Sequence, residues 1–401
     1  MNGGNKIKKY TYLKFGSLLI KFIFLSHPTF SNINKTLVEK YSDKIPMSIN
    51  VNIKNNEAQP AYFNYVFIKT IDASIREDAS INAKEIIKFP FNTKLKVLEK
   101  VKSNGNEWYK VELINTDGIK RFGYISSLLV TFRTFRFEEM DNRIKSLSSF
   151  LKSESENNKK LVSINTYKPN PNNKNMNRTK DKYGTSADQN AKALYKDEVI
   201  YIPDRTLLSI EFEKDNYLYV NTPNIPEKPL KINKNLISRY PFINPDFKKV
   251  IVIDLDNENQ GIFEKTLNNN WELISYTLNK TGLESTLGFE TPKGYFIVPM
   301  VKYEMGFRDD FNTSGGIAKY AIRFSGGGYI HGTPINFEEE INRDFFLQEK
   351  DSTLGTVEGT RKCIRNTEAH IKFLFDWVTN GKVNRKSNEQ KPDENVMVII
   401  F

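Results

Sequence analysis

The sequence contains one cysteine, Cys363, and three histidines, of which His331 precedes the cysteine on the same C-terminal stretch. A cysteine nucleophile needs a base that takes its proton and donors that stabilise an oxyanion. Arg361, Lys362 and Arg365 surround Cys363, and their positive charge favours a thiolate. These residue types permit a cysteine–histidine dyad. A lone cysteine is, however, more often a small buried residue, and a lone histidine more often structural.

An amphipathic helix is predicted just after Cys363, in "TEAHIKFLFDWVTNG". Thr367 is a suitable N-cap and Gly381 a suitable C-terminal stop. The positive end of this helix would lower the pKa of a nearby thiol. His370 lies within the helix, and we expect it to be structural. The consecutive residues Glu338–Glu340 point in different directions on a helix, which favours a solvated face over paired catalytic carboxylates.

The longer sequence around the two residues resembles the active-site signature of the L,D-transpeptidases. In that family His-Gly-(Thr/Ser) on one strand is followed, after a lid-like segment, by Ser-His-Gly-Cys-(Ile/Val)-(Arg/Asn). The corresponding pieces here are "YIHGTP" (Tyr329 to Pro334) and "GTRKCIRN" (Gly359 to Asn366). Upstream, "GFETPKGYFIV" (Gly288 to Val298) resembles the Thr-Pro-x-Gly-x-Phe segment, and "VIVIDLDNENQ" (Val250 to Gln260) the opening strand. All the pieces stand in the family order.

The resemblance implies a role for each matching residue. Cys363 would be the nucleophile and His331 its general base, with the carbonyl of Gly332 accepting a hydrogen bond from the far ring nitrogen. The backbone amides of Lys362 and Cys363 would stabilise the oxyanion, and Arg365 would brace the loop or bind a substrate carboxylate. The other residues expected on the oxyanion and substrate side are Thr360, Arg361, Tyr329 and Thr333.

The sequence departs from the family pattern in two places. Arg361-Lys362 replaces the usual His-Gly, which removes the second histidine and the backbone freedom of the glycine, so we expect a variant oxyanion loop. The segment after His331 is also longer than usual, and it contains the acidic, aromatic "NFEEEINRDFFLQEKDS". This insertion is either a mobile lid or a solvated surface helix.

The activity that the resemblance implies is acyl transfer on peptidoglycan stem peptides through a cysteine thioester, without metal or cofactor. Two alternatives stay open. Water as the acceptor would make the protein an L,D-carboxypeptidase, and the missing second histidine would fit a non-catalytic cell-wall-binding protein.

Composition limits the partners. The formal net charge of +11 and the pI near 9.2 favour a polyanion, such as an anionic cell-envelope polymer. Nucleic acid is disfavoured, because zinc-finger spacings and aromatic-basic ribonucleoprotein motifs are missing from the sequence. One cysteine excludes an intramolecular disulfide.

The N-terminal residues 1–31 are typical of a secretory leader. Lys6, Lys8, Lys9 and Lys14 precede the apolar "FGSLLIKFIFLS", which Lys21 interrupts. This predicts export to the periplasm or cell wall, with a membrane tether if the leader is retained. An amphipathic helix of a cytosolic protein is the alternative.

The elements that would position the site are mainly β-strands. Residues 62–130 alternate short β-rich runs with turn signals and resemble bacterial SH3-type domains through "ASIREDAS", "NEWYKV" and "GYISSLLV". Residues 193–245 repeat part of this pattern, which predicts a degenerate second SH3-like module. Residues 131–192 are expected to form a helix and a flexible linker, with the linker from Thr166 to Lys192. Residues 247–401 would form the β-rich catalytic domain with short helices.

Overall fold

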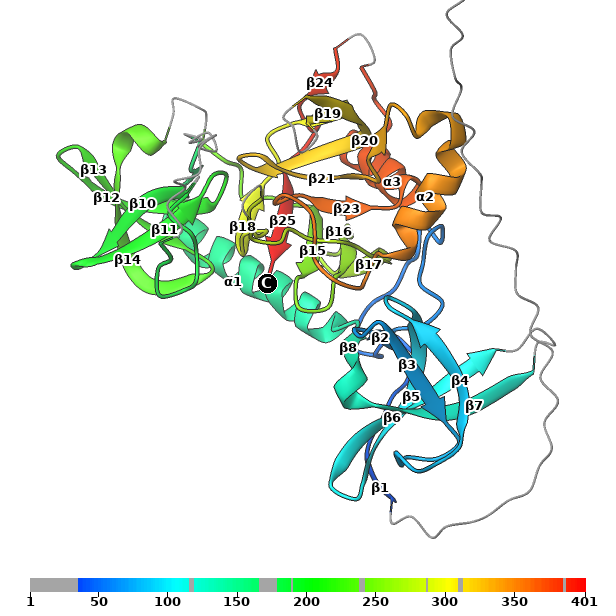
Figure 1. The fold of residues 1–401 in the computed structure, drawn as a ribbon. Helices are drawn as coiled ribbons and strands as arrows, with labels where there is room; N and C mark the ends of the chain where they lie inside the picture. Colours follow the sequence, from blue (N-terminus) through cyan, green and yellow to red (C-terminus); the bar gives the residue numbers. More distant parts are fainter. Residues whose placement is uncertain are drawn as a thin grey trace, which may run out of the picture.

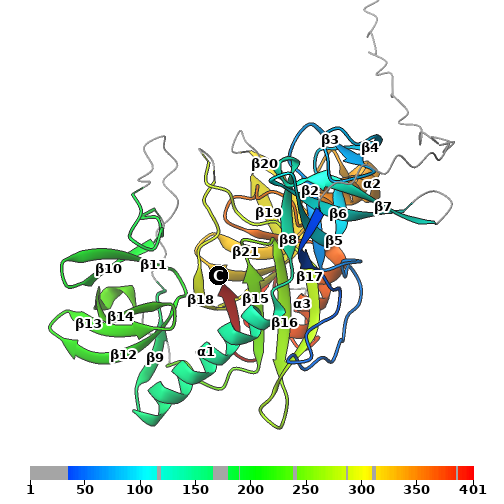
Figure 2. The same ribbon diagram turned by 90° about the horizontal axis from the view of Figure 1, so that it is seen from below.

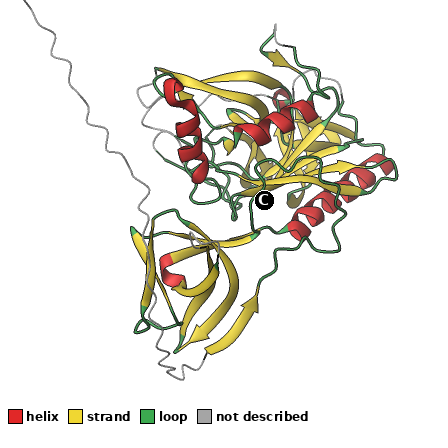
Figure 3. Ribbon diagram, turned by 90° about the vertical axis from the view of Figure 1, so that its right-hand side faces the viewer, coloured by secondary structure: helices red, strands yellow, loops and turns green. Residues whose placement is uncertain are grey.

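The computed structural model describes residues 35–114, 119–165, 179–188, 190–237, 242–285, 288–308, 313–384 and 387–401. The expected leader lies outside these residues. The described chain forms three β-rich units (Figure 1), and its helices flank the strands (Figure 3). The predicted fold class, mainly β with an SH3-like module, is therefore confirmed. Among the described residues, no helix is long and apolar enough to span a membrane.

The first unit is an antiparallel sheet with the order β4-β3-β7-β6-β5-β2-β8, and β1 pairs with β5. Its core consists of alternate residues of these strands, among them Val66, Ile75 and Val111, all fully buried. The unit begins before the predicted residue 62, because β1 adds to its edge. The elements are β1 Lys35–Lys40, β2 Asn64–Ile68, β3 Asp72–Arg76, β4 Glu85–Pro90, β5 Lys94–Ser103, β6 Asn106–Ile114, β7 Lys120–Ser126, η1 Ser127–Leu129 and β8 Val130–Thr134.

The second unit is a sheet with the order β11-β10-β14-β13-β12-β9. Its first strand, β9, lies just before the predicted linker of Thr166 to Lys192, pairs with β12 and buries Val162 in the core of this unit. The start of β10 lies within the predicted linker, while residues 166–178 and 189 of that linker are outside the described part of the chain. The elements are β9 Lys160–Ser163, β10 Asn190–Tyr195, β11 Glu198–Pro203, β12 Leu207–Lys214, β13 Tyr217–Thr222, β14 Ile225–Asn233 and η2 Lys234–Leu236.

The third unit contains two sheets, with the orders β17-β16-β15-β25-β18 and β23-β21-β20-β19-β24, and β22 pairs with β20. A shared apolar core joins them and includes Ile253, Phe296, Ile330 and Ile364. The elements of the first sheet are β15 Lys249–Asp254, β16 Asn259–Lys265, β17 Trp271–Leu278, β18 Gly294–Ile297 and β25 Val396–Ile400. Those of the second are β19 Val301–Arg308, β20 Ser314–Ser325, β21 Gly328–Gly332, β22 Ile335–Asn336, β23 Ile364–Asn366 and β24 Glu389–Gln390.

Three helical segments belong to the third unit. They are η3 Glu340–Asn342, α2 Arg343–Ser352 and α3 Glu368–Val378. The predicted cap of α3 is confirmed, because the Thr367 hydroxyl accepts a hydrogen bond from the amide of His370 at 3.2 Å. Gly381, just beyond the helix, has the left-handed φ of +71° that favours glycine at this position.

Helix α1, Phe137–Glu156, connects the first unit to the second and packs across the sheet of the third unit beside β15 (Figure 2). Its apolar face recurs at helical spacing and buries Met140, Ile144 and Leu147 in one core with residues of β15 and β25. The helix thereby fixes the three units to each other.

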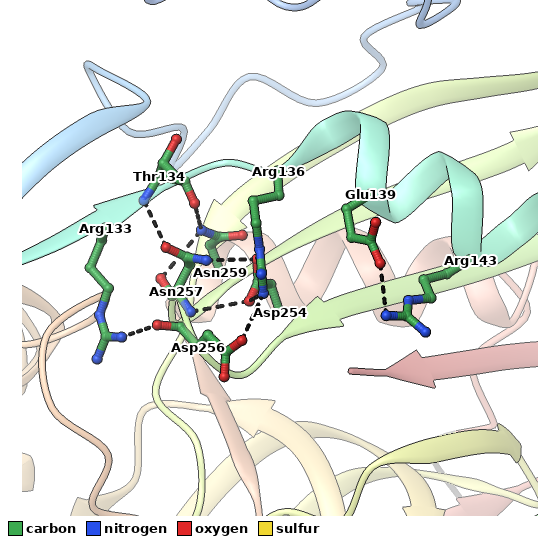
Figure 4. Close-up of polar contacts among 9 residues, drawn as sticks. All are labelled: Arg133, Thr134, Arg136, Glu139, Arg143, Asp254, Asp256, Asn257 and Asn259. Carbon is green, nitrogen blue, oxygen red and sulfur yellow. Dashed lines mark hydrogen bonds and ion pairs between the residues drawn. The ribbon is translucent and has the colours of Figure 1, made fainter. Parts of the chain in front are cut away.

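A polar cluster holds the start of α1 against the turn between β15 and β16 (Figure 4). The guanidinium of Arg136 donates to both carboxylate oxygens of Asp254, each at 2.6 Å, and to Asp256 at 3.0 Å. The side chain of Asp254 is fully buried. The amide and side chain of Asn257 also donate to Asp254, so the buried carboxylate is well satisfied.

We expect Arg136→Gln to lower the free energy of unfolding by about 3–5 kcal/mol, because it leaves the Asp254 carboxylate buried without its cation. Glu139→Gln is the matched control. Glu139 forms an exposed i,i+4 pair with Arg143 on the same helix, and its loss should cost only about 0.5 kcal/mol. Urea unfolding measures both values, and equal effects of the two substitutions would contradict the central role of the buried pair.

Candidate functional site

His331 lies on β21, and Cys363 lies immediately before the neighbouring parallel strand β23. β21 pairs with β23, with Ile330 opposite Ile364 and His331 opposite Arg365. Side chains alternate along a strand, so the two isoleucines face the core and His331 faces the opposite side together with Arg365. Cys363 precedes Arg365 by two residues and therefore belongs to that same side. Strand spacing puts such diagonal backbone positions roughly 8 Å apart, within the joint reach of two side chains.

The thiol of Cys363 is directed at the glycine turn between β20 and β21. Its Sγ lies 3.6 Å from the carbonyl oxygen of Gly327, and the residue is half-buried. Burial raises the pKa of Cys363 to about 11, although a hydrogen bond from the backbone of Tyr329 and the charge of Lys362 oppose this. At neutral pH the resting residue is a thiol.

His331 is 6% exposed, and its Nδ1 lies 2.7 Å from the carbonyl oxygen of Gly332. A carbonyl can only accept, so Nδ1 carries the proton and Nε2 is left as the basic nitrogen. Burial lowers the pKa of His331 to about 4, the backbone hydrogen bond partly offsets this, and the nearby charge of Arg365 lowers it further. The imidazole is therefore neutral at pH 7, which is the form a general base requires.

In the described conformation Cys363 and His331 make no hydrogen bond to each other, since the thiol is engaged at the glycine turn. Rotation about the single χ1 angle of Cys363 redirects the sulfur without moving either strand. Catalytic hydrogen bonds are often long or misaligned before substrate binds. The strands thus bring the pair to one face, while the final contact requires a rotamer change.

Lys362 occupies the position of the family's glycine and takes a glycine-like backbone conformation, with φ of +81°. Its side chain is buried, and Nζ donates to the carbonyl of Gly326 at 2.7 Å. Burial lowers the pKa of Lys362 to about 8, while the charges of Asp204, Cys363 and Glu290 act against this. Lys362 therefore has a left-handed backbone conformation that favours glycine, and the lysine is strained there.

Thr291, in the "ETPKGYF" segment, binds the backbone of the loop that precedes Cys363. It was not among the predicted site residues. Its hydroxyl donates to the carbonyl of Lys362 at 3.0 Å and accepts from the amide of Gly282 at 2.7 Å. A side chain at Gly282 would lie 2.6 Å from the Cα of Lys362, so the two loops touch backbone to backbone. The resemblance of this segment to a known motif was the signal, but the sequence did not say which atom the threonine binds.

Arg365 connects β23 to α2. Its guanidinium donates to the carbonyl of Lys350 at 2.8 Å and to the Thr353 hydroxyl at 2.7 Å, which corresponds to the bracing alternative. Thr333 also reaches this helix through a hydrogen bond to Asp351. None of the residues of α2 is fully buried, so the insertion forms a surface helix held at its C-terminal end. Its motion as a lid stays a prediction.

The first unit contacts the end of this insertion directly. The ammonium of Lys94 donates to the carbonyls of Ser352 and Leu354 at 2.8 and 2.6 Å, and the Tyr65 hydroxyl donates to the carbonyl of Gly355 at 2.7 Å. The first unit is thereby connected to β23 through the end of the insertion and Arg365.

The remaining predicted residues surround the loop. Thr360 donates to the carbonyl of Cys363, Tyr329 is partly exposed beside it, and Arg361 is exposed with a 3.4 Å hydrogen bond to the carbonyl of Arg308. His370 is fully buried in α3, as a structural residue would be. Of the predicted acidic cluster, Glu339 and Glu340 pair with Lys350 and Arg343. Within the described part of the chain, no three His, Cys, Asp or Glu side chains are grouped as metal ligands.

Comparison with known proteins identifies one domain. Residues 72–131 match the family model of the bacterial SH3 domain. A comparison with curated protein sequences found no match. Solved structures that resemble parts of the chain include a fused Zn-dependent amidase/peptidase/peptidoglycan-binding domain protein of Clostridium acetobutylicum, with 18% identity and a TM-score of 0.24 over 38% of this chain and 52% of that one. The chain thus matches only about half of that protein's length.

Two further structures are similar to a larger share of the chain. L,D-transpeptidase 1 of Mycobacterium tuberculosis has 13% identity and a TM-score of 0.24, with coverage of 51% of this chain and 77% of that one. NlpC1 of Trichomonas vaginalis has 10% identity and a TM-score of 0.14, with coverage of 74% and 94%.

We expect the two buried histidines to make the protein less stable in acid. Burial lowers the pKa of His331 to about 4 and that of His370 to about 3. Below about pH 6.5 the unfolded chain therefore binds protons at both histidines, while the folded chain keeps them neutral. The contribution of each histidine is present above pH 6.5 and is lost as the pH falls toward its folded value, by up to roughly 3 kcal/mol for His331 and roughly 5 kcal/mol for His370.

Urea unfolding at pH 7 and pH 4.5 measures this loss. His331→Asn and His370→Leu should each make the free energy of unfolding less dependent on pH over this interval. An unchanged dependence in both variants would show that the histidines are not buried in their neutral form.

Proposed function

We propose that the protein is an L,D-transpeptidase acting on peptidoglycan stem peptides. The observation that carries the proposal is the parallel pairing of β21 with β23, in which His331 lies opposite Arg365 while Cys363 immediately precedes Ile364. The neutral imidazole of His331, with its proton on Nδ1, supports the role of a general base. Thr291 of the third motif adds to this support, because it binds the backbone of the nucleophile loop.

The proposed reaction is a ping-pong acyl transfer. Sγ of Cys363 attacks the carbonyl carbon of the third stem residue as Nε2 of His331 takes the thiol proton. The C–N bond to the terminal D-alanine then breaks, the leaving amine takes the proton from the imidazolium, and a thioester remains. An amine of a neighbouring stem attacks the thioester, an amide forms, and the sulfur leaves with a proton. No electron transfer is involved.

The SH3-like units and the leader fit this proposal. The bacterial SH3 domain at residues 72–131 and the second unit would bind peptidoglycan and raise the local concentration of substrate. The net charge of +11 would favour contact with anionic envelope polymers. Export is part of the proposal, because stem peptides are found outside the membrane and residues 1–31 have the leader pattern.

We expect Cys363→Ala to abolish conversion of tetrapeptide-rich muropeptides and His331→Asn to slow it by about 10²- to 10⁴-fold, the range for loss of a general base. His370→Leu is the matched control, because it removes a buried histidine of the same chain outside the dyad. Mass spectrometry of the products after incubation measures the conversion.

The products also separate the alternatives. Cross-linked dimers together with released D-alanine support transpeptidation, and monomeric tripeptides without dimers indicate a carboxypeptidase. Muropeptides that wild type and Cys363→Ala both leave unchanged would overturn the enzymatic function and favour a cell-wall-binding protein.

A further inference from the structure

The second unit inserts an acidic side chain into the third unit beside the nucleophile loop. Asp204 follows β11, and its side chain is fully buried. Arg323 of β20 lies 3.1 Å from its carboxylate, and the backbone carbonyl of Asp204 accepts from the Ser325 hydroxyl at 3.0 Å. The neighbouring Thr206 forms a β-bridge with Phe296. The turn after β11 therefore packs against β18 and β20 of the third unit.

The nucleophile loop is fastened to the glycine turn at two consecutive points. Nζ of Lys362 donates to the carbonyl of Gly326, and Sγ of Cys363 lies against the carbonyl of Gly327. Gly326 and Gly327 follow Ser325 in the chain. The turn at Asp204 therefore contacts Ser325, and the two glycines after it contact Lys362 and Cys363.

We propose that Lys362 is a positioning residue that favours the thiolate of Cys363 by its charge, and that Asp204 of the second unit keeps this lysine charged. The use of this device in acyl transfer rests on the proposed function. The charges of Asp204, Cys363 and Glu290 favour the charged form of Lys362, and the charge of Arg323 opposes it. Arg205 lies beside Asp204, at 3.5 Å from its carboxylate.

Lys362 has two unfavourable features, and one of them concerns its charge. A lysine with φ of +81° is strained where glycine would not be, and an ammonium buried to 4% exposure loses its hydration. The lysine position therefore carries both a backbone cost and a desolvation cost. A buried cation beside a thiol stabilises the thiolate strongly, because little water screens the two charges. A buried carboxylate from another unit offsets the desolvation of the cation in the same way.

The proposal makes a specific prediction for pH. The pKa of Lys362 is lowered to about 8, so the lysine is charged below that pH and neutral above it. The thiolate gains from the charge only below about pH 8. The reactivity of the thiol should rise with pH, flatten near pH 8 as the lysine loses its proton, and rise again at higher pH.

The test is alkylation of the full-length protein with iodoacetamide between pH 6 and pH 10. Cys363 is the only cysteine in the sequence, so all labelling reports on this residue. Lys362→Met and Lys362→Gly should both be alkylated about tenfold more slowly than wild type at pH 7, equivalent to one unit in the thiol pKa, and both should lose the flattening near pH 8. Asp204→Asn should keep the flattening but move it to lower pH, since removal of the carboxylate lowers the pKa of Lys362.

Lys362→Gly separates charge from backbone geometry. It relieves the strain at positive φ, so the protein should unfold at a higher denaturant concentration even as its thiol becomes less reactive. A purely structural lysine would not give this opposite pair of results. Lys362→Gly also keeps the test open if Lys362→Met does not fold.

Glu198→Gln is the matched control for loss of an acidic group from the second unit. Glu198 begins β11 and pairs with Lys182 within that unit, so its loss leaves Asp204, Glu290 and Lys362 in place. Its alkylation profile should match wild type.

A Lys362→Gly profile identical to wild type at every pH would overturn the proposal, as would an Asp204→Asn profile with its flattening still near pH 8. Muropeptide conversion is measured on the same preparations. If wild type converts nothing while the alkylation profiles follow the prediction, the proposed function fails and the assignment of Lys362 stands.

Discussion

The parallel pairing of β21 with β23 is the constraint on which the candidate site depends. The two strands are separated by the insertion that contains α2, yet their register is fixed by Ile330 and Ile364, both fully buried in the core between the sheets. A shift by one residue would turn these isoleucines out of the core and turn His331 into it. The free energy of burying two apolar side chains thus determines which side chains share the reactive face. Core packing and chemistry cannot vary independently here.

The first and second units both contact segments of the third unit that adjoin the Cys363 loop, although the third unit alone contains the predicted dyad. The first unit binds the end of the insertion through Lys94 and Tyr65, and the second places Asp204 next to the glycine turn. Helix α1 crosses the third unit and holds the other two at its sides (Figure 2). An enzyme with tethered binding modules would need only a flexible connection. The observed contacts instead make the first and second units part of the support of the candidate site.

The sequence predicted what depends on local pattern. The mainly β class, the SH3-like domain at its approximate place and the Thr367 cap were predicted correctly, because strand alternation, turn residues and caps are written in adjacent residues. The predicted linker of Thr166 to Lys192 overlaps the start of β10, and the short edge strand β9 just before it was not predicted, since its partner β12 is more than forty residues away in the chain. The glycine-rich stretch before His331 forms the turn of the hairpin between β20 and β21. Asp204 could not be found from the sequence, because its meaning depends on contact between two units.

Arg361 and Lys362, which stand where the motif that this stretch resembles has His-Gly, lie in different surroundings. At this position the chain needs a left-handed turn, since Gly282 lies against the Cα of Lys362 and Thr291 binds its carbonyl. Glycine meets that need without strain, whereas the lysine is strained there and binds the glycine turn through its buried ammonium. The neighbouring Arg361 is exposed at the surface. The two positions are therefore not equivalent: Arg361 lies at the surface, and Lys362 buries an ammonium against the same glycine turn that the Cys363 thiol contacts.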